Sequence, residues 1–494
     1  METQSQAVVD KLRAAFRSGV TLPEQFRRSQ LTQLMSMIKD NEEQILEALH
    51  KDLAKVPHPL LKLPPSGRRS LSRSLLSRQP KFEAVLSEVD IVINDLHYAL
   101  ANLKSWMQPE YVSKNLATKF DDCFVRREPL GVVLIIGAWN YPLHLVLLPM
   151  IGAIAAGNCV VLKPSEVSPA TDRVVAELVP KYLSQECYAV VSGGAEETKA
   201  LLRNRFDHIF YTGSQSVARS ILQTAAVHLT PVTLELGGKC PCVIYGQVDV
   251  AAAARRLIWS KFFNAGQSCV APDYVLCSPA TRDALLPAVK KSLEDFYGKE
   301  PQASPDFSRI VSDRHWTRLV ELLKKTSGRI VVEGESNQKD KYIAPTVVVD
   351  VSEDDILMKE EIFGPILPIL TIDSLEQGID FINQREKPLA LYVFSNESSV
   401  VNTVLENTSS GGFCSNDGIL HMTLPGLPFG GVGASGWGSY HGRWGFETFT
   451  HRRAVMLRGW ALERLNGLRY PPYADDRLSW LRWTASPKSS CSIL

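Results

Sequence analysis

The sequence has almost no excess of charge of either sign. Its 54 lysines and arginines and 53 aspartates and glutamates leave a formal net charge of +1 over 494 residues. This gives no electrostatic reason to expect nucleic acid as a partner. The nine cysteines are scattered and odd in number, which argues against a disulfide framework and favours a reduced intracellular protein. The N-terminal residues are amphipathic and lack the apolar core of a secretory signal.

Several catalytic motifs are missing or stand in the wrong place. No G-x-S-x-G segment is present, which weakens an interpretation as a serine hydrolase. Gly237-Gly238-Lys239 is followed by Cys240, not by the Ser or Thr of a P-loop, and Cys240 and Cys242 have no second ligand pair at zinc spacing. A literal G-x-G-x-x-G runs from 431 to 436 without the strand–turn–helix context of a dinucleotide site. We therefore predict no metal and no phosphate at these positions.

One long uncharged run resembles a membrane span in length. From Pro129 to Leu162 there is no Asp, Glu, Lys or Arg. Its interior contains a short β-rich run, the turn Trp-Asn-Tyr-Pro, a helix-length run over 143–156, and then Asn158 before a second apolar run. Pro and Asn at the middle of a bilayer would be costly. The run predicts a buried strand, turn, helix and strand in a soluble sheet.

Short apolar runs alternate with helical segments along most of the chain. This rhythm predicts an α/β fold with two doubly wound parallel-sheet domains, one on each side of about residue 240. The strands expected in the first domain are 130–136, 159–162, 188–192, 207–211 and 231–235, with helices such as 170–183 and 214–227. The second domain is expected to contain strands 273–277, 343–349, 366–371, 389–394 and 411–415, with helices 280–297 and 313–326.

The segment Val56–Gln79 interrupts this rhythm. It is rich in Pro, Ser, Arg and Leu and has no usable periodicity, so we expect a loop or a disordered insert. Its arginines are compatible with acidic lipid, but a solvated surface excursion explains them more simply. No internal repeat is evident.

Polar residues follow several of the predicted strands of the first domain. Asn140, Lys163 and Gly213 come after three of them, and Glu235 ends a fourth. Cys269 follows one helix later, in the run Phe-Phe-Asn-Ala-Gly-Gln-Ser-Cys, where small and polar residues expose a side chain. Because ligands bind at the carboxyl ends of parallel strands, this set predicts a site with Cys269 as a candidate nucleophile. Each residue alone has a plainer explanation, such as a surface lysine or a capping carboxylate.

Seven short motifs occur in an order that identifies a family. They are NYP at 140–142, KPSE at 163–166, FYTGS at 210–214, LELGGK at 234–239, NAGQSC at 264–269, EEIFGP at 360–365 and PFGG at 428–431. The chain resembles the aldehyde dehydrogenases, and within them the class 3 branch, from its N-terminal helix to about Arg453. The sequence departs from the family pattern at Ala138, at Ala218 and at Cys240, which stands where a small polar residue is usual.

The resemblance implies a role for each matching residue. Cys269 would attack the aldehyde carbon, Asn140 would help to bind the resulting oxyanion, and Glu235 would be the general base. The residues implied in binding the cofactor are Lys163, Glu166, Gly213, Ser214, Glu361 and Phe363. The cofactor would be NAD, with NADP left open. Tyr141, Trp259 and Phe263 either line a lipophilic substrate entrance or are ordinary core aromatics.

The resemblance also implies a division of the chain. It assigns 1–109 and 131–235 to a cofactor-binding domain, 236–420 to a catalytic domain, and 110–130 and 421–453 to an oligomerisation extension that builds a homodimer. Residues 454–494 form a C-terminal tail. The expected reaction oxidises medium- and long-chain lipid-derived aliphatic aldehydes, and aromatic ones as well, to carboxylic acids through a Cys269 thioester. A cysteine-dependent esterase and an inactive membrane-bound scaffold are the alternatives.

The chain ends in Cys491-Ser-Ile-Leu494, which matches the prenylation signal with a preference for geranylgeranyl. One lipid chain anchors weakly, so a second contribution is needed. Trp480, Leu481 and Trp483 are candidates for it. These features predict a lipid-anchored protein, peripheral on the cytoplasmic face of the plasma membrane or of lipid droplets, without a transmembrane span.

Overall fold

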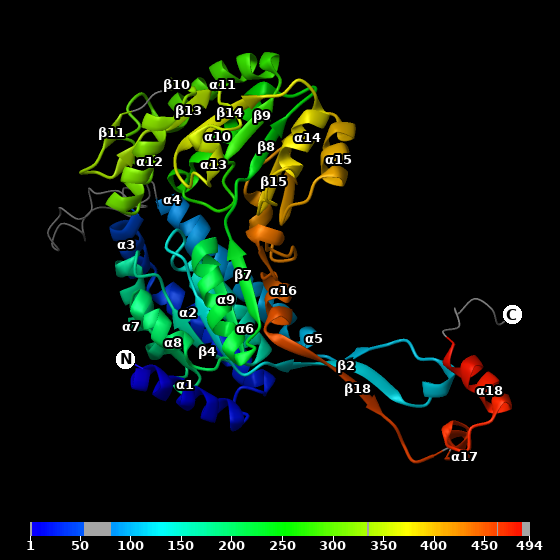
Figure 1. Cartoon of the computed structure of the whole chain (residues 1–494). Coiled ribbons are helices and arrows are strands. Elements are labelled where there is room, and N and C mark those ends of the chain that lie inside the picture. Colours follow the sequence, from blue (N-terminus) through cyan, green and yellow to red (C-terminus); the bar gives the residue numbers. More distant parts are fainter. Residues whose placement is uncertain (1, 54–80, 333–334, 462, 487–494) are drawn as a thin grey trace.

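The computed structural model describes residues 2–53, 81–332, 335–461 and 463–486. Within these residues the chain forms two main sheets, each covered by helices, and a long arm built on a three-stranded antiparallel sheet (Figure 1). The two predicted α/β domains are confirmed. The insert at 56–79 and the signal at 491–494 lie outside the described residues.

The first sheet has the strand order β17-β7-β6-β3-β4-β5, and every pair is parallel except β17 with β7. Its strands are β3 (Val132–Ile136), β4 (Cys159–Lys163), β5 (Tyr188–Val190), β6 (His208–Gly213), β7 (Val232–Leu236) and β17 (Gly436–Trp437). The strand order reverses between β3 and β6, which is the switch point of a doubly wound sheet. The predicted strands of this domain are therefore confirmed to within two residues at nearly every end.

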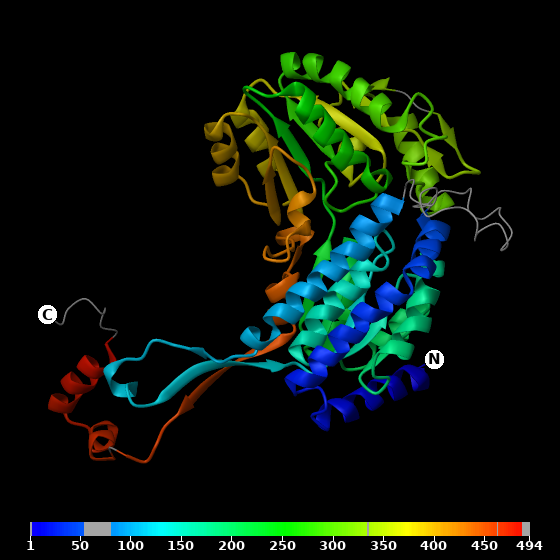
Figure 2. The ribbon, with the colours of Figure 1, turned by 180° about the vertical axis from the view of Figure 1, so that it is seen from behind.

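Helices cover this sheet in two groups. Helices α6 (His144–Ala156) and α7 (Pro169–Tyr182) pack with α2 (Glu24–Asp40), while α8 (Ala195–Leu202) contacts α9 (Gln215–His228). Helix α5 (Ile91–Trp106) packs on α2 and α6 (Figure 2). The N-terminal helix α1 (Glu2–Arg17) contacts α8 and the strands β3 and β4.

The uncharged run from Pro129 to Leu162 folds as β3, α6 and β4, as predicted. Helix α6 is buried along its whole length and ends at Gly157, whose φ of 94° is easy only for glycine. Asn158 is buried, and its polar side chain is satisfied there: it accepts a hydrogen bond from the Gly131 amide (2.9 Å) and donates one to the Phe449 carbonyl (2.9 Å). Among the residues that the structure describes, no helix combines the length and the apolar character that a bilayer crossing requires.

The second sheet has the order β10-β13-β14-β9-β8-β15-β16, with β10 antiparallel to β13 and the other pairs parallel. Its strands are β8 (Pro241–Ile244), β9 (Tyr274–Cys277), β10 (Arg329–Val332), β13 (Thr346–Val349), β14 (Ile366–Thr371), β15 (Ala390–Phe394) and β16 (Gly412–Ser415). Helices α10 (Val250–Phe262), α11 (Pro279–Tyr297) and α12 (Asp313–Lys325) belong to this domain (Figure 1). Strand β8 was not predicted, because it is short and starts with a proline.

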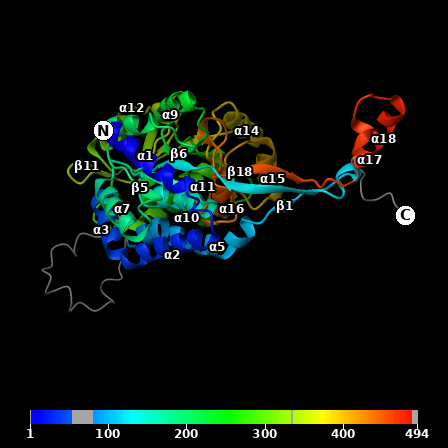
Figure 3. The same ribbon diagram turned by 90° about the horizontal axis from the view of Figure 1, so that it is seen from below.

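The arm consists of β2 (Asp122–Pro129) and β18 (Thr450–Leu457), paired antiparallel along their whole length, with the short strand β1 (Glu110–Tyr111) antiparallel on the other edge of β2. It projects away from both sheets and carries α17 (Glu463–Asn466) and α18 (Asp475–Ala485) near its far end (Figures 1, 2 and 3). The arm thus brings parts of the segments 110–130 and 421–453 together. The second segment is divided, however, because β17 joins the first sheet beside Glu235, and β18 continues beyond Arg453.

Candidate active site

The predicted polar residues lie at the carboxyl ends of the parallel strands of the first sheet. Lys163 ends β4, Gly213 ends β6, and Asn140 follows β3 after a short turn. Thr212 on β6 pairs in register with Glu235 on β7, so their side chains share one face of the sheet. The carboxyl ends of parallel strands meet at the same edge, and this is where ligands bind in such sheets.

A narrow cavity lies beside Cys269. Its volume is about 20 Å³, and its wall includes Cys269, Glu235 and Thr212 together with the ring of Tyr141. Both carboxylate oxygens of Glu235 and the hydroxyl of Thr212 are buried and have no hydrogen-bond partner among the described residues. A site of this size with several free polar atoms suits one ordered water molecule.

The backbone before Cys269 is unusual. Asn264, Ala265 and Gly266 have φ values of 53°, 51° and 73°, so three consecutive residues are left-handed. For residues with a Cβ this conformation is strained, and such strain persists only where surrounding contacts enforce it. Here the Asn264 side chain donates to the carbonyls of Asn140 (2.9 Å) and Gln267 (3.1 Å). The Asn140 amide also donates to the Gln267 carbonyl (3.2 Å), which ties the end of β3 to this loop.

Burial dominates the electrostatics of Cys269 and Glu235. It raises the pKa of the Cys269 thiol well above its usual range, and the carboxylates of Glu361 and Glu235 add to the rise. The backbone N–H groups of Cys269 and Val270 act in the opposite direction. Burial also raises the pKa of Glu235 far above its usual range. Both shifts favour the protonated form, so each group ionises more readily if its proton passes directly to an acceptor.

Lys163 and Glu166 form a pair at the carboxyl end of β4. The Lys163 ammonium is buried and donates to a Glu166 carboxylate oxygen (2.7 Å) and to the Pro164 carbonyl (2.8 Å). Burial is the largest single effect on Glu166 and disfavours its ionised form, but the hydrogen bond and charge of Lys163, together with a backbone hydrogen bond, hold the pKa of Glu166 below its usual range. The Glu166 side chain is half exposed, so it can also accept from a ligand hydroxyl.

Gly213 and Ser214 form the turn between β6 and α9. Gly213 has a φ of 155°, and a Cβ there would overlap the hydroxyl of Tyr211. The Tyr211 hydroxyl donates to the Ser214 carbonyl (3.3 Å), and Ser214 is the N-cap of α9. This turn exposes backbone amides at a helix N-terminus, which favours an anionic group such as pyrophosphate.

Glu361 and Phe363 reach the same region from the second domain. A Cβ on Gly237 would overlap the Glu361 carboxylate, so glycine allows the two segments to approach. Burial raises the pKa of Glu361 to about 8, and the nearby Asp273 contributes to the rise. Phe363 has a φ of 50° and packs edge-on against Trp139, with ring centroids 5.3 Å apart.

The three aromatic residues predicted for the substrate entrance behave differently. Tyr141 is buried and lines the cavity beside Cys269. Trp259 and Phe263 contact each other edge-on, with ring centroids 5.5 Å apart, and do not line this cavity. Asn140 does not line it either, since its amide serves the loop described above.

The sequence interpretation missed two histidines in the cavity wall. His144 and His441 both line it, and their rings lie 6.2 Å apart. Burial lowers the pKa of His441 far below its usual range, so it is a neutral side chain here. His144 follows the NYP motif by two residues, which could have drawn attention to it, but the approach of residue 441 requires the folded chain.

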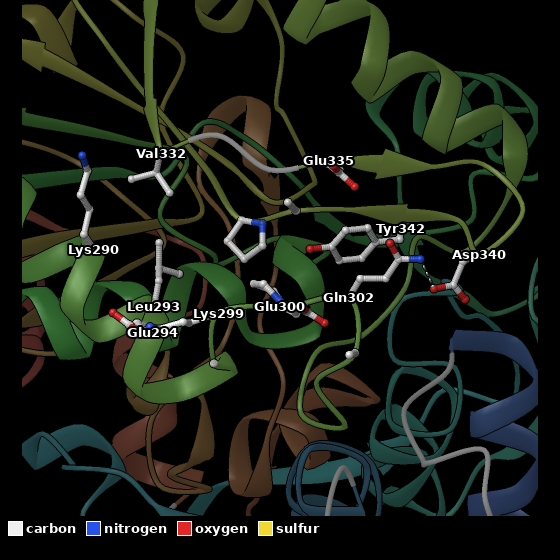
Figure 4. A pocket seen from close by; sticks show the side chains of 15 residues that line it. Lys290, Leu293, Glu294, Lys299, Glu300, Gln302, Val332, Glu335, Asp340 and Tyr342 are labelled. Atoms are coloured by element: carbon white, nitrogen blue, oxygen red, sulfur yellow. Dashed lines mark hydrogen bonds and ion pairs between the residues drawn. The ribbon is translucent and has the colours of Figure 1, made fainter.

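A larger groove of about 1030 Å³ lies elsewhere, at the outer edge of the second domain (Figure 4). Its walls come from α11, the following loop and the strand region around Tyr342, and charged side chains of both signs surround it. None of the predicted site residues lies in its wall. Size alone therefore does not mark the candidate site. Among the described residues there is also no cluster of His, Cys, Asp and Glu suited to a metal ion.

The sequence and the fold were compared with those of known proteins. A family model described as the aldehyde dehydrogenase family matches residues 75–455. The chain belongs to the aldehyde dehydrogenase family. It is 50% identical over 490 residues to the mouse protein called aldehyde dehydrogenase family 3 member B2, covering 99% of this chain and 97% of that relative.

Solved structures of aldehyde dehydrogenases have the same fold as this chain. A Staphylococcus aureus AldH in a substrate-bound state superposes with a TM-score of 0.89 at 40% identity, covering 96% of this chain and 98% of that one. A Mycobacterium tuberculosis aldehyde dehydrogenase complexed with NAD+ gives 0.78 at 27% identity, covering 93% and 92%. The predicted family, its class 3 branch and its fold are therefore confirmed, and the chain is an oxidoreductase of the aldehyde dehydrogenase type.

Proposed function

We propose that this chain oxidises aldehydes to carboxylic acids through a covalent intermediate on Cys269. The observation that carries the proposal is the shared cavity, in which the Cys269 thiol and the partnerless Glu235 carboxyl enclose room for one water molecule. An assay of a panel of aldehydes, read by absorbance of the reduced cofactor, tests it. Absence of cofactor reduction with every aldehyde, alongside hydrolysis of simple esters, would favour the esterase alternative instead.

The first step is attack of the Cys269 thiolate on the aldehyde carbon. Because burial opposes the thiolate, its proton must pass to a base as the carbon–sulfur bond forms. The developing oxyanion then needs hydrogen-bond donors, and the Cys269 backbone N–H and the Asn140 amide are the candidates. The Asn140 side-chain amide has two N–H donors, and in this structure it donates to the Gln267 carbonyl from the nitrogen that would also serve the oxyanion.

The second chemical task is hydrolysis of the thioester. Glu235 would take a proton from the attacking water, with the Thr212 hydroxyl helping to hold that water. Because Glu235 has a raised pKa, it is a stronger base than an ordinary carboxylate once it is ionised. A buried carboxyl with no salt-bridge partner suits this role better than a structural one, since an unpaired carboxyl in a fold is costly.

The residues at this edge would hold NAD, or NADP in its place, which would supply the hydride acceptor when bound. The donor and acceptor set fits a dinucleotide. The Lys163 ammonium and the half-exposed Glu166 carboxylate suit ribose hydroxyls, and the Gly213–Ser214 turn at the start of α9 suits pyrophosphate. Glu361 and Phe363 would bind the nicotinamide half. The NAD+ complex of the Mycobacterium tuberculosis relative supports this assignment.

Glu166→Gln should change the cofactor preference. Glu166 is held ionised by Lys163, and its negative charge repels the 2′-phosphate of NADP. We expect kcat/KM for NADP relative to NAD to rise roughly tenfold, as for the loss of one like-charge contact. Initial rates with both cofactors measure this ratio. An unchanged ratio would remove Glu166 from the ribose site.

We further propose lipid-derived aliphatic aldehydes as substrates. Apart from its few polar groups, the cavity is lined by apolar and aromatic side chains, including Leu145, Met422 and Phe429. Such a wall favours an alkyl chain or an aromatic ring over a sugar or a charged substrate. Its small volume means that a long substrate can enter only if lining side chains move. A rise in kcat/KM from short to long alkyl aldehydes would support this class, and a flat or falling series would exclude it.

A membrane anchor at Cys491 is part of the same proposal. Upstream of it, Trp480 and Trp483 on α18 leave about half of their side chains exposed, at 57% and 49%. Exposed tryptophans on a terminal helix suit the interfacial region of a bilayer. Together with a geranylgeranyl chain they would provide the second contribution that stable anchoring needs.

Cys491→Ser should move the protein from the membrane fraction to the cytosol. Activity towards a soluble short aldehyde should stay unchanged, because residue 491 is remote in sequence from every residue proposed for the reaction. Cell fractionation with immunodetection measures the distribution. Retention of the variant on membranes would mean that the anchor lies elsewhere.

The arm supports a homodimer. It exposes large apolar side chains, among them Tyr111, Phe120, Met456 and Leu457, on strands and loops that project from both sheets. Apolar surface of this extent is unusual on a monomer and is expected to be covered by a second copy of the chain. Sedimentation at micromolar concentration should give the mass of a dimer. A monomer under these conditions would contradict the proposal.

A further inference from the structure

A second cysteine lies directly behind the Cys269 loop. Cys240, the residue directly before β8, is completely buried, and its thiol donates to the backbone carbonyl of Cys269 with a sulfur–oxygen distance of 3.2 Å. The Ala390 amide donates to the same sulfur (3.4 Å). The residues next to Cys269 in the sequence, Ser268 and Val270, carry no thiol. Among the described residues, the sulfur of Cys240 forms a hydrogen bond to the backbone of Cys269.

The distance suits a disulfide. The carbonyl oxygen and the Cα of one residue are separated by two bonds, so the Cys240 sulfur lies no more than about 6 Å from the Cys269 Cα. In a disulfide the two Cα atoms are typically about 5.5–6 Å apart, so bonding the two sulfurs requires rotation of both side chains and a backbone shift that brings the Cα atoms into this range.

We propose that Cys240 is a resolving thiol for Cys269, so that oxidation by hydroperoxides stores the nucleophile as a reversible Cys240–Cys269 disulfide. The inference concerns thiol oxidation and does not depend on aldehyde oxidation by this site. Hydroperoxides are the chemical class of oxidant, and hydrogen peroxide is small enough to approach a cavity with room for one water molecule.

The chemistry balances in two steps. The Cys269 thiolate attacks one oxygen of hydrogen peroxide; a sulfur–oxygen bond forms, the oxygen–oxygen bond breaks, and one water leaves after protonation. The Cys240 thiolate then attacks the sulfenic sulfur; the sulfur–sulfur bond forms, the sulfur–oxygen bond breaks, and a second water leaves. Two thiols lose two electrons in total, and one peroxide is reduced to two waters.

Burial raises the pKa of both thiols, so the first step is slow at neutral pH and accelerates as the pH rises. This affects how fast Cys269 is oxidised. It also affects which product forms, because the sulfenic acid becomes a disulfide only where attack by the Cys240 thiolate is faster than further oxidation to sulfinic acid. The disulfide therefore protects Cys269 from irreversible loss.

The test is oxidation of the full-length protein with hydrogen peroxide at pH 8, followed by alkylation, intact-mass measurement and peptide mapping without reductant. Wild type should lose two hydrogens, yield a peptide pair joining residues 240 and 269, and recover its activity with dithiothreitol. Cys240→Ser should keep its activity before oxidation. After oxidation it should gain oxygens on Cys269 and recover on the order of tenfold less activity with reductant, because sulfinic acid is not reduced by thiols.

Two controls make the outcome specific. Cys242→Ser changes a thiol two residues away that is equally buried, and it should behave as wild type. Cys159 and Cys187 hydrogen-bond to each other, so mapping is needed to distinguish a disulfide between them from the proposed one. Equal recovery of wild type and Cys240→Ser, or a wild-type map in which Cys269 is overoxidised or joined to another cysteine, would overturn the proposal.

Discussion

Cys269→Ala is expected to reduce cofactor reduction by any aldehyde by a factor on the order of 10,000 or more, the scale of loss when a covalent nucleophile is removed. The alanine retains the Cβ but has no atom that can bond to the aldehyde carbon. Cofactor binding should survive, because the residues proposed to bind it lie on β4, β6, α9 and the segment around Glu361. Steady-state rates and a fluorescence titration with NADH measure the two properties separately.

Cys277→Ala is a suitable control for this variant. Cys277 is buried in β9 and takes no part in the cavity wall, so its loss removes a thiol without touching the site. It should keep nearly full activity. Turnover by Cys269→Ala at a rate comparable to wild type would refute the nucleophile assignment, and loss of NADH binding as well would point to a damaged fold.

Glu235→Gln is expected to slow steady-state turnover by about 100- to 10,000-fold, which is the range for removal of a general base. The amide has the same shape but cannot accept a proton from water. If Glu235 acts in thioester hydrolysis, the first turnover still releases one NADH per site, because hydride transfer precedes hydrolysis. Stopped-flow absorbance should therefore show a burst close to the wild-type rate, followed by a slow phase.

The pH dependence adds a second readout for Glu235. Burial raises the pKa of Glu235, so the ionised base becomes available only as the pH rises. The wild-type turnover rate should therefore increase with pH, giving a rising limb in its pH profile. Glu235→Gln should lose that limb from its slow phase. Equal loss of the burst and of the slow phase would show that Glu235 activates the Cys269 thiol instead.

Local patterns were enough to predict most strands of the two sheets, but not β8, β10 or β17. Strand β3 is a continuous run of Val, Leu and Ile that is buried on both faces, and Gly157 and Asn158 mark the end of α6 by their turn chemistry. The arm was not predicted as strands because β2 pairs with β18, more than 300 residues later in the sequence, and has no buried face of its own. Strand β17 was missed for a different reason: it has only two residues, Gly436 and Trp437, and so offers no apolar run.

The candidate site also contains some features that the sequence predicts and others that only the folded chain shows. Cys269, Glu235 and Lys163 could be predicted because each follows or ends an apolar strand or stands in a recognisable motif. The approach of His441 to His144, and of Cys240 to the Cys269 loop, could not, because no spacing in the sequence encodes those contacts. The hydrogen bond that occupies the Asn140 amide was likewise visible only in the folded chain.

The most direct test of the proposed mechanism is to trap the thioester. Glu235→Gln mixed with NAD and benzaldehyde and quenched in acid should gain the mass of one benzoyl group in exchange for one hydrogen, and peptide mapping should locate that group on Cys269. Glu235→Gln carrying Cys269→Ala as well should gain nothing. A stoichiometric burst of NADH without any acyl group on Cys269 would contradict covalent catalysis by this residue.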